Sequence, residues 1–197
     1  MAIQKETPLS YIENKFKKKL YYHFTPAPFI SNFSPLLIVF QDKEGSVPQD
    51  FEYKMWNVLI PKGPCIEDRM LLQELIEDLE EEYDCAGHIY CYGGDGMGYS
   101  AVLHGILADA NAVFIDTLDM KLETSPEDIL YTEAQKSQRF PLLYLHHEKQ
   151  LKQNDMFLKF FNIKVTIDRN DDLDCKMPNR LEKVLDCLAR MKYKNVE

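Results

Sequence analysis

The chain has 197 residues, of which 45% are hydrophobic, so it can bury one sizeable core and is short for two domains. Its formal net charge of -9 argues against nucleic acid as the main partner, because binding phosphates requires clustered lysine and arginine. No segment reaches the roughly 18 to 20 continuous apolar residues of a membrane helix. The N-terminus has no apolar core typical of a signal peptide. We therefore expect one cytoplasmic domain that binds neither nucleic acid nor membrane.

The five cysteines are odd in number, widely spaced and without a C-x-x-C pair. This spacing predicts reduced thiols rather than a disulfide framework or a zinc knuckle. The five are Cys65, Cys85, Cys91, Cys175 and Cys187.

In chain order, the polar residues 1–15 are expected to be a flexible lead-in. The basic run that starts at Lys15 and ends at Lys19 is expected to be solvated. Residues 20–24 predict a first strand, and the apolar run 35–40 predicts a strand buried on both faces. Residues 56–60 predict another buried strand, which Pro61 is expected to end.

The remainder of the chain alternates between helical and strand patterns. Helices are predicted at 67–83, where apolar residues recur at helical spacing, from 98 to about 108, from Ser125, and from Pro178 to near the C-terminus. Strands are predicted at 88–92, 112–116, 141–145 and 163–167, the last two with a helix between them. This alternation predicts a single α/β domain over residues 1–197, a three-layer sandwich around a mostly parallel sheet. Ligands of such sheets bind at the C-terminal ends of the strands.

Four glycines fall within six positions between a predicted strand and a predicted helix, at Gly93, Gly94, Gly96 and Gly98. Glycine costs backbone entropy on folding, so the segment must need positive φ or a close backbone approach. One interpretation is tight packing of the helix on the strand. The other is functional, because backbone N–H groups at a helix start can stabilise an anion or a developing oxyanion.

The segment Tyr92-Gly-Gly-Asp-Gly-Met-Gly-Tyr-Ser-Ala101 resembles the nucleophile elbow of the α/β-hydrolase superfamily. The order of predicted elements is also similar over about residues 20–192. The branches that the chain looks most like are small bacterial hydrolase-like proteins, some tied to capsule or accessory secretion loci. The resemblance implies an α/β-hydrolase-like fold and a hydrolase or acyl-transferring activity, with no cofactor, on a substrate that the sequence does not identify.

The resemblance places Asp95 at the tip of the elbow, as in epoxide hydrolases and haloalkane dehalogenases, where a histidine then activates water. The family histidine follows the last strand, but residues 168–178 contain no histidine. His146 and His147 instead occupy the usual position of the acid, and Asp116 could complete the set. The resemblance therefore implies a rearranged or degenerate triad.

An oxyanion hole in this arrangement would use the N–H of Gly96, beside Gly94, and one from Gln41 or Asp42. Met97 stands where the elbow usually has a small residue. Ser100 is a rival nucleophile by its G-x-S spacing, but it is expected inside the helix, as a packing residue on the same face as His104.

Two alternatives from other classes stay open. The spacing Gly94-x-Gly96-x-Gly98 followed by Asp116 is also typical of a nucleotide or S-adenosylmethionine site. A hydrolase-like protein without catalysis, kept as a binding or assembly protein, would explain the missing histidine. Its interface could use the aromatic residues near the N-terminus: Tyr11, Phe16, Tyr21, Tyr22, Phe24, Phe29 and Phe33. No metal site is expected at His146 and His147, because adjacent strand residues point to opposite sides.

Overall fold

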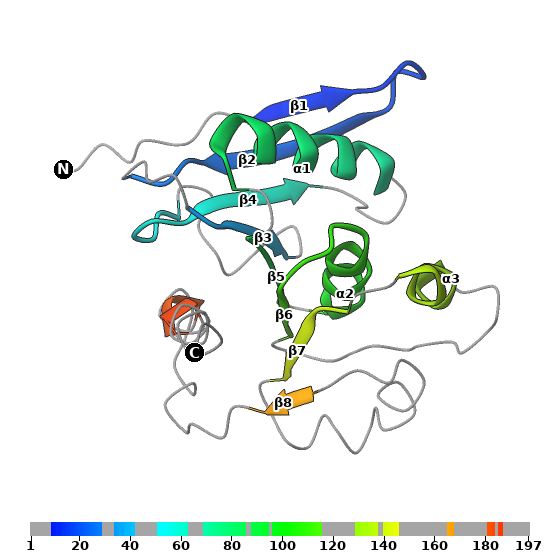
Figure 1. The fold of residues 1–197 in the computed structure, drawn as a ribbon. Coiled ribbons are helices and arrows are strands. Elements are labelled where there is room, and N and C mark those ends of the chain that lie inside the picture. The colour runs from blue at the N-terminus through cyan, green and yellow to red at the C-terminus, as the bar shows by residue number, and fades with distance from the viewer. Residues whose placement is uncertain are drawn as a thin grey trace.

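The computed structural model describes residues 9–28, 34–41, 51–62, 69–85, 88–94, 96–115, 129–137, 140–145, 165–167, 181–183 and 185–186. These form an eight-stranded sheet with the order β1-β2-β4-β3-β5-β6-β7-β8 (Figure 1). The strands are β1 Ser10–Glu13, β2 Lys19–Thr25, β3 Leu36–Phe40, β4 Asn57–Lys62, β5 Ile89–Gly93, β6 Ala112–Ile115, β7 Leu142–Leu145 and β8 Val165–Ile167. The helices are α1 Arg69–Tyr83, α2 Gly98–Leu107 and α3 Ile129–Lys136.

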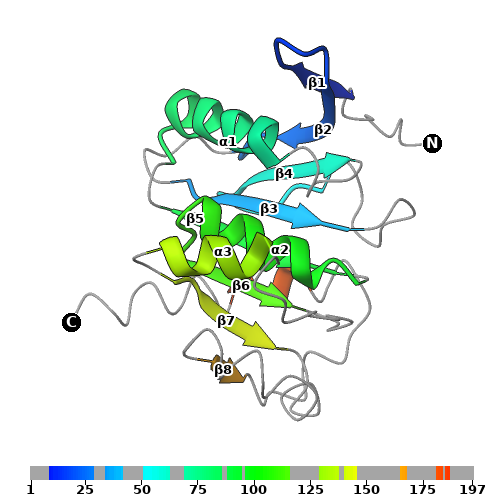
Figure 2. The same cartoon turned by 90° about the vertical axis from the view of Figure 1, so that its right-hand side faces the viewer.

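The sheet is mostly parallel. Strand β2 is antiparallel to both β1 and β4, and the pairs from β4–β3 through β7–β8 are parallel. Parallel neighbours need crossover connections, and α1, α2 and α3 lie in those from β4 to β5, from β5 to β6 and from β6 to β7. Figure 2 shows the arrowheads of β3, β4 and β7 directed toward the same edge of the sheet. The predicted fold class, a three-layer α/β sandwich, is confirmed.

Each face of the sheet has its own hydrophobic core. On one face, α1 and α2 pack against the sheet through residues such as Leu72, Ile76 and Leu103. The predicted apolar stripe of α1 is confirmed, because its buried residues are Leu71, Leu72, Leu75, Ile76 and Leu79. On the other face, Trp56 packs with Leu181 and Leu185 of the helical residues 181–183 and 185–186. Figure 1 shows this C-terminal segment, in red, across the sheet from α2 and α3.

The direction of the crossovers explains why α1, α2 and α3 share one face. The connections β4–β5, β5–β6 and β6–β7 all step in the same direction along the sheet, and right-handed crossovers then fall on one side. The connection from β3 to β4 steps in the opposite direction, and its residues Phe51, Tyr53 and Trp56 belong to the core of the other face.

Two sequence-based expectations are wrong. The flexible lead-in predicted over residues 1–15 is wrong for Ser10–Glu13, which form β1 and pair with β2, while residues 1–8 lie outside the described residues. The four residues of β1 alternate between half-buried and exposed, a pattern too short to stand out in a polar segment. Pro61 does not end the strand that it follows, since β4 continues to Lys62. The pairing of β4 with β3 stops at Leu59, so Pro61 lies where only β2 is a neighbour, as proline requires.

The helix start predicted at Ser125 and the helix predicted between β7 and β8 lie outside the described residues. Within the described part of the chain, no helix combines the length and apolar character needed to cross a membrane.

The close approach of α2 to β6 at Gly105 yields a first prediction. A Cβ added at Gly105 would lie 2.5 Å from Cγ2 of Val113, a stiff β-branched residue of β6. We expect Gly105→Ala to lower the free energy of unfolding by about 1–3 kcal/mol, measured by urea denaturation. Adding Val113→Ala should make the double variant less destabilised than the sum of the two single changes. Strictly additive losses would contradict this contact.

Candidate functional site

The topology of the sheet places the candidate site between β3 and β5. The connection that leaves β3 leads to β4 on one side, and the connection that leaves β5 leads to β6 on the other. In open α/β sheets, ligands bind in the crevice at the C-terminal strand ends where the connections diverge in this way. The two strand ends that meet there are Phe40 of β3 and Gly93 of β5, which are paired in the sheet.

A tight turn follows β5 at this point. The N–H of Gly94 donates to the carbonyl of Phe40 at 3.0 Å, which extends the β3–β5 pairing beyond Gly93. The N–H of Met97 donates to the carbonyl of Gly94 at 2.9 Å and closes a four-residue turn. Gly96, the third residue of that turn, has φ of +81°, a value that L side chains disfavour. The chain therefore reverses sharply at the crest of the sheet.

The turn leads directly into α2, which begins at Gly98. The N–H of Ala101 donates to the carbonyl of Met97 at 3.0 Å, and the side chain of Met97 provides no cap at this helix end. The positive end of the α2 dipole therefore lies next to the turn, where negative charge is stabilised.

The glycines of this segment have different roles. A Cβ on Gly93 would lie 2.9 Å from Cβ of Ala101 and 3.0 Å from Cα of Gly98, so Gly93 permits the close packing of α2 on β5. A Cβ on Gly96 would meet nothing within 4 Å. Packing thus explains Gly93, whereas Gly96 is needed for its backbone conformation and borders open space. The packing interpretation is confirmed for Gly93, and Gly96 meets the expected need for positive φ.

Aromatic rings lie behind the turn on both faces of the sheet. Tyr92 is buried and stacks on Phe114 of β6, with ring centroids 5.8 Å apart. A Cβ on Gly94 would lie 3.0 Å from Cε1 of Tyr92. On the other face, Phe40 stacks on His104 of α2 at 5.3 Å. These rings pack against the ends of β3 and β5, and no sequence pattern predicts either stack.

Among the described residues near the turn, three side chains that carry possible chemistry are buried: Ser100, His104 and Cys91. Ser100, the rival nucleophile, lies in the first turn of α2 with 5% of its surface exposed. His104, on the same helix, is fully buried against Phe40. Burial raises the pKa of the Cys91 thiol on β5 far above its ordinary value, so this thiol stays neutral and is a poor nucleophile.

The structure places part of the predicted site. Gly94 and Gly96 form the turn, and Gln41 directly follows β3 at the same edge, largely buried. The remaining predicted site residues lie outside the described residues: Asp42, Asp95, Asp116, His146 and His147.

The strand ends that lead to these residues are described, and they are in register. Phe40 pairs with Gly93, Gly93 with Ile115, and Ile115 with Leu145. Asp116 and His146 are the next residues in the sequence after Ile115 and Leu145. The four strands β3, β5, β6 and β7 thus end in one row, and candidate catalytic residues follow three of these ends in the sequence.

No protein-family model matches the chain, and no curated protein matches it in sequence. Solved structures match it in fold. Esterase 2 of the planctomycete Thermogutta terrifontis, phosphoramylated by tabun, is 12% identical with a TM-score of 0.58, over 98% of this chain and 96% of the esterase. A Staphylococcus aureus protein of unknown function is 10% identical with a TM-score of 0.55, over 93% of this chain and 98% of that one.

Larger proteins also match. Dipeptidyl peptidase 4 of Porphyromonas gingivalis is 13% identical with a TM-score of 0.52, and a thermostable esterase is 12% identical with a TM-score of 0.56. Each match covers 82% of this chain, which spans 31% of the length of the peptidase and 54% of that of the esterase. The esterases and the peptidase have the α/β-hydrolase fold, so the resemblance predicted from the glycine segment is confirmed at the level of the fold.

The conformation of Gly96 yields the second prediction. Because alanine disfavours positive φ and its Cβ would meet no neighbour, Gly96→Ala should lower the free energy of unfolding by about 1–2 kcal/mol through backbone strain alone. Gly96→Asn should cost less, since asparagine tolerates this conformation. Urea denaturation of both variants measures the difference. An alanine variant as stable as the parent would contradict the positive φ.

Proposed function

We propose that this chain is a hydrolase whose site lies at the C-terminal ends of β3, β5, β6 and β7, with Asp95 as its nucleophile. The observation that carries the proposal is the sharp turn at the point where the connections diverge, closed by the Met97–Gly94 hydrogen bond with positive φ at Gly96. Asp95 lies in the sequence between the two glycines of this turn.

The fold supports a hydrolytic activity. The matching structures include esterases and a peptidase, and two of the esterase structures are described as butyrate-bound and propionate-bound. Those activities belong to those proteins. What they share with this chain is a sheet of the same fold, in which catalysis is placed on the strand ends.

A carboxylate nucleophile suggests substitution at carbon. One carboxylate oxygen of Asp95 attacks an electrophilic carbon of an epoxide or an alkyl halide. With an alkyl halide the carbon–halogen bond breaks and halide leaves. With an epoxide the ring carbon–oxygen bond breaks, and the oxygen stays on the adjacent carbon as an alkoxide that takes a proton from water. The resulting ester is then hydrolysed. Water adds to the carbonyl carbon of the aspartyl ester, the alcohol leaves, and the carboxylate is regenerated with one oxygen from water.

The second step needs a base and an oxyanion site. His146 or His147 follows β7 in the sequence and would take the proton from water, with Asp116 after β6 to orient the imidazole. The N–H groups of Gly96 and of Gln41, or of its neighbour Asp42, would stabilise the tetrahedral oxyanion. The adjacent N-terminus of α2 stabilises the same negative charge.

The third prediction tests the nucleophile. Asp95→Asn should reduce turnover of a panel of epoxides and haloalkanes by at least about a thousandfold. Ser100→Ala is the matched control, since Ser100 is buried in α2, and it should retain activity. A single turnover in water carrying a heavy oxygen isotope should place the label in the peptide that contains Asp95.

The opposite pattern, in which Ser100→Ala removes turnover and Asp95→Asn does not, would contradict the assignment. A parent protein without turnover of any substrate on the panel would favour the non-catalytic binding protein. A thermal shift on adding S-adenosylmethionine or a nucleotide would favour the cofactor-binding alternative.

A further inference from the structure

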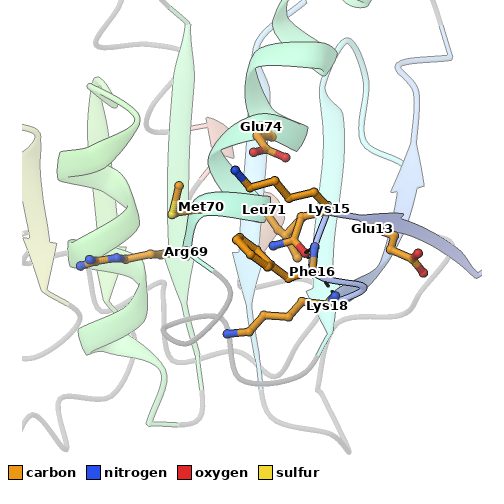
Figure 3. Close-up of a pocket in the computed structure, with 9 residues that line it drawn as sticks. Glu13, Lys15, Phe16, Lys18, Arg69, Met70, Leu71 and Glu74 are labelled. Atoms are coloured by element: carbon orange, nitrogen blue, oxygen red, sulfur yellow. Dashed lines mark hydrogen bonds between the residues drawn. The ribbon is translucent and has the colours of Figure 1, made fainter.

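A cavity of about 710 Å³ lies away from the candidate site, between the turn that joins β1 to β2 and the start of α1 (Figure 3). Its size is within the range of sites that hold small ligands or a few residues of a peptide. Its lining residues come from the hairpin and from the first turns of the helix: Glu13, Asn14, Lys15, Phe16, Lys18, Arg69, Met70, Leu71 and Glu74.

The cavity presents apolar side chains to solvent. Phe16 is 73% exposed and Met70 is 72% exposed, and both line the cavity together with the buried Leu71. Large side chains exposed in this way leave apolar area in contact with water, and clusters of them mark interaction sites. Aromatic residues and methionine are also enriched in protein–protein interfaces. The cavity therefore has an apolar centre.

Cations surround this apolar centre. In Figure 3, Lys18 and Arg69 extend to the same side of the hairpin, one from each wall of the cavity, while Glu13 points away from them. Glu13 is paired with Lys19 at 3.5 Å, and Lys15 lies over the Phe16 ring at 5.1 Å from its centroid. Arg69 has one long contact with Glu133, at 3.9 Å. The lining carries three cations, Lys15, Lys18 and Arg69, against two carboxylates, Glu13 and Glu74. In a chain of net charge -9, this is a local excess of positive charge.

The hairpin turn holds Phe16 in place before any ligand binds. Oδ1 of Asn14 accepts hydrogen bonds from the N–H of Phe16 at 2.9 Å and of Lys18 at 3.2 Å. The N–H of Lys17 donates to the carbonyl of Asn14 at 2.9 Å, and Lys17 has φ of +59°. A lysine in this conformation is strained, and the asparagine bonds offset that strain. These bonds fix the backbone that carries Phe16, and a preorganised backbone lowers the entropic cost of binding.

We propose that this cavity is a docking site for an acidic segment of a partner protein, one that carries an apolar side chain between its carboxylates. The apolar side chain packs between Phe16 and Met70, and the carboxylates lie against Lys18 and Arg69. The concave shape favours a peptide over a membrane, because a flat lipid surface would reach the hairpin tip and leave the α1 wall at Met70 uncovered. This docking site does not depend on the proposed hydrolase activity.

The fourth prediction uses a probe in place of the unidentified partner. A fluorescein-labelled peptide in which glutamate alternates with phenylalanine and leucine should bind the full chain, measured by fluorescence anisotropy. Phe16→Ala should weaken binding about tenfold or more, because it removes the central aromatic contact. Lys18→Glu and Arg69→Glu should each weaken binding about fivefold or more at low salt, and raising the salt concentration should reduce this loss.

The matched control is Lys183→Glu, which reverses an exposed charge in the C-terminal helical segment and should leave binding unchanged. Circular dichroism melting curves like that of the parent would show that the variants are folded. Equal binding of a peptide with lysine in place of glutamate, or undiminished binding by the Phe16 and Arg69 variants, would overturn the proposal. So would Phe16-dependent sedimentation with phosphatidylglycerol vesicles without any binding of the acidic peptide.

Discussion

One backbone hydrogen bond, from the N–H of Gly94 to the carbonyl of Phe40, ties the glycine turn to the sheet. It continues the pairing of β3 with β5 past the last residue of β5, so the turn starts from a fixed position at the strand ends. The connections that leave β3 and β5 diverge, and a crevice is expected where they part. The candidate site is therefore a consequence of strand order together with this one bond.

The close packing of α2 depends on the same turn. Gly93 lets Ala101 approach β5, and Gly105 lets Val113 of β6 approach the helix, so α2 lies low over these two strands. The core on that face is completed by α1, and an aromatic core fills the other face. A sharp turn followed by a closely packed helix brings the α2 N-terminus to the sheet edge. The anion site proposed at that edge therefore depends on backbone geometry, through the turn and the α2 N-terminus.

The sequence predicted the fold because most elements are long or strongly patterned. The continuous apolar run of β3 and the helical spacing of apolar residues in α1 both indicate which side chains are buried. Strand β1 was missed because it has four residues and is stabilised by pairing with β2 and by a turn around Asn14. A strand that is stabilised by such pairing and has only four residues shows too little alternation of hydrophobicity to be detected in the sequence. The prediction at Pro61 is wrong because a strand accepts proline where it has a neighbour on one side only. The sequence does not show where the pairing with β3 stops.

The candidate site was predictable in part for the same reason. The four glycines within six positions located the turn at Gly94 and Gly96. So many glycines are explained only by a backbone that needs positive φ or close approach. The sequence alone does not show which glycine is needed for close packing and which for its backbone conformation. That distinction requires the distance from Gly93 to Ala101. The docking cavity could not be predicted from the sequence. Phe16 and Met70 are far apart in the chain, and both line the cavity only because the hairpin lies beside the start of α1. The sequence places Phe16 among the aromatic residues that could form an interface, but it gives no sign that Met70 lies beside it.

The most direct test of the central claim is an NMR measurement on the Gly94 amide in deuterated protein. A scalar coupling across the hydrogen bond to the Phe40 carbonyl, with hydrogen exchange as slow as that of neighbouring β5 amides, is the result expected if the turn is fixed to the sheet. An amide of Gly94 that shows no such coupling and exchanges as fast as an unstructured peptide would contradict the account.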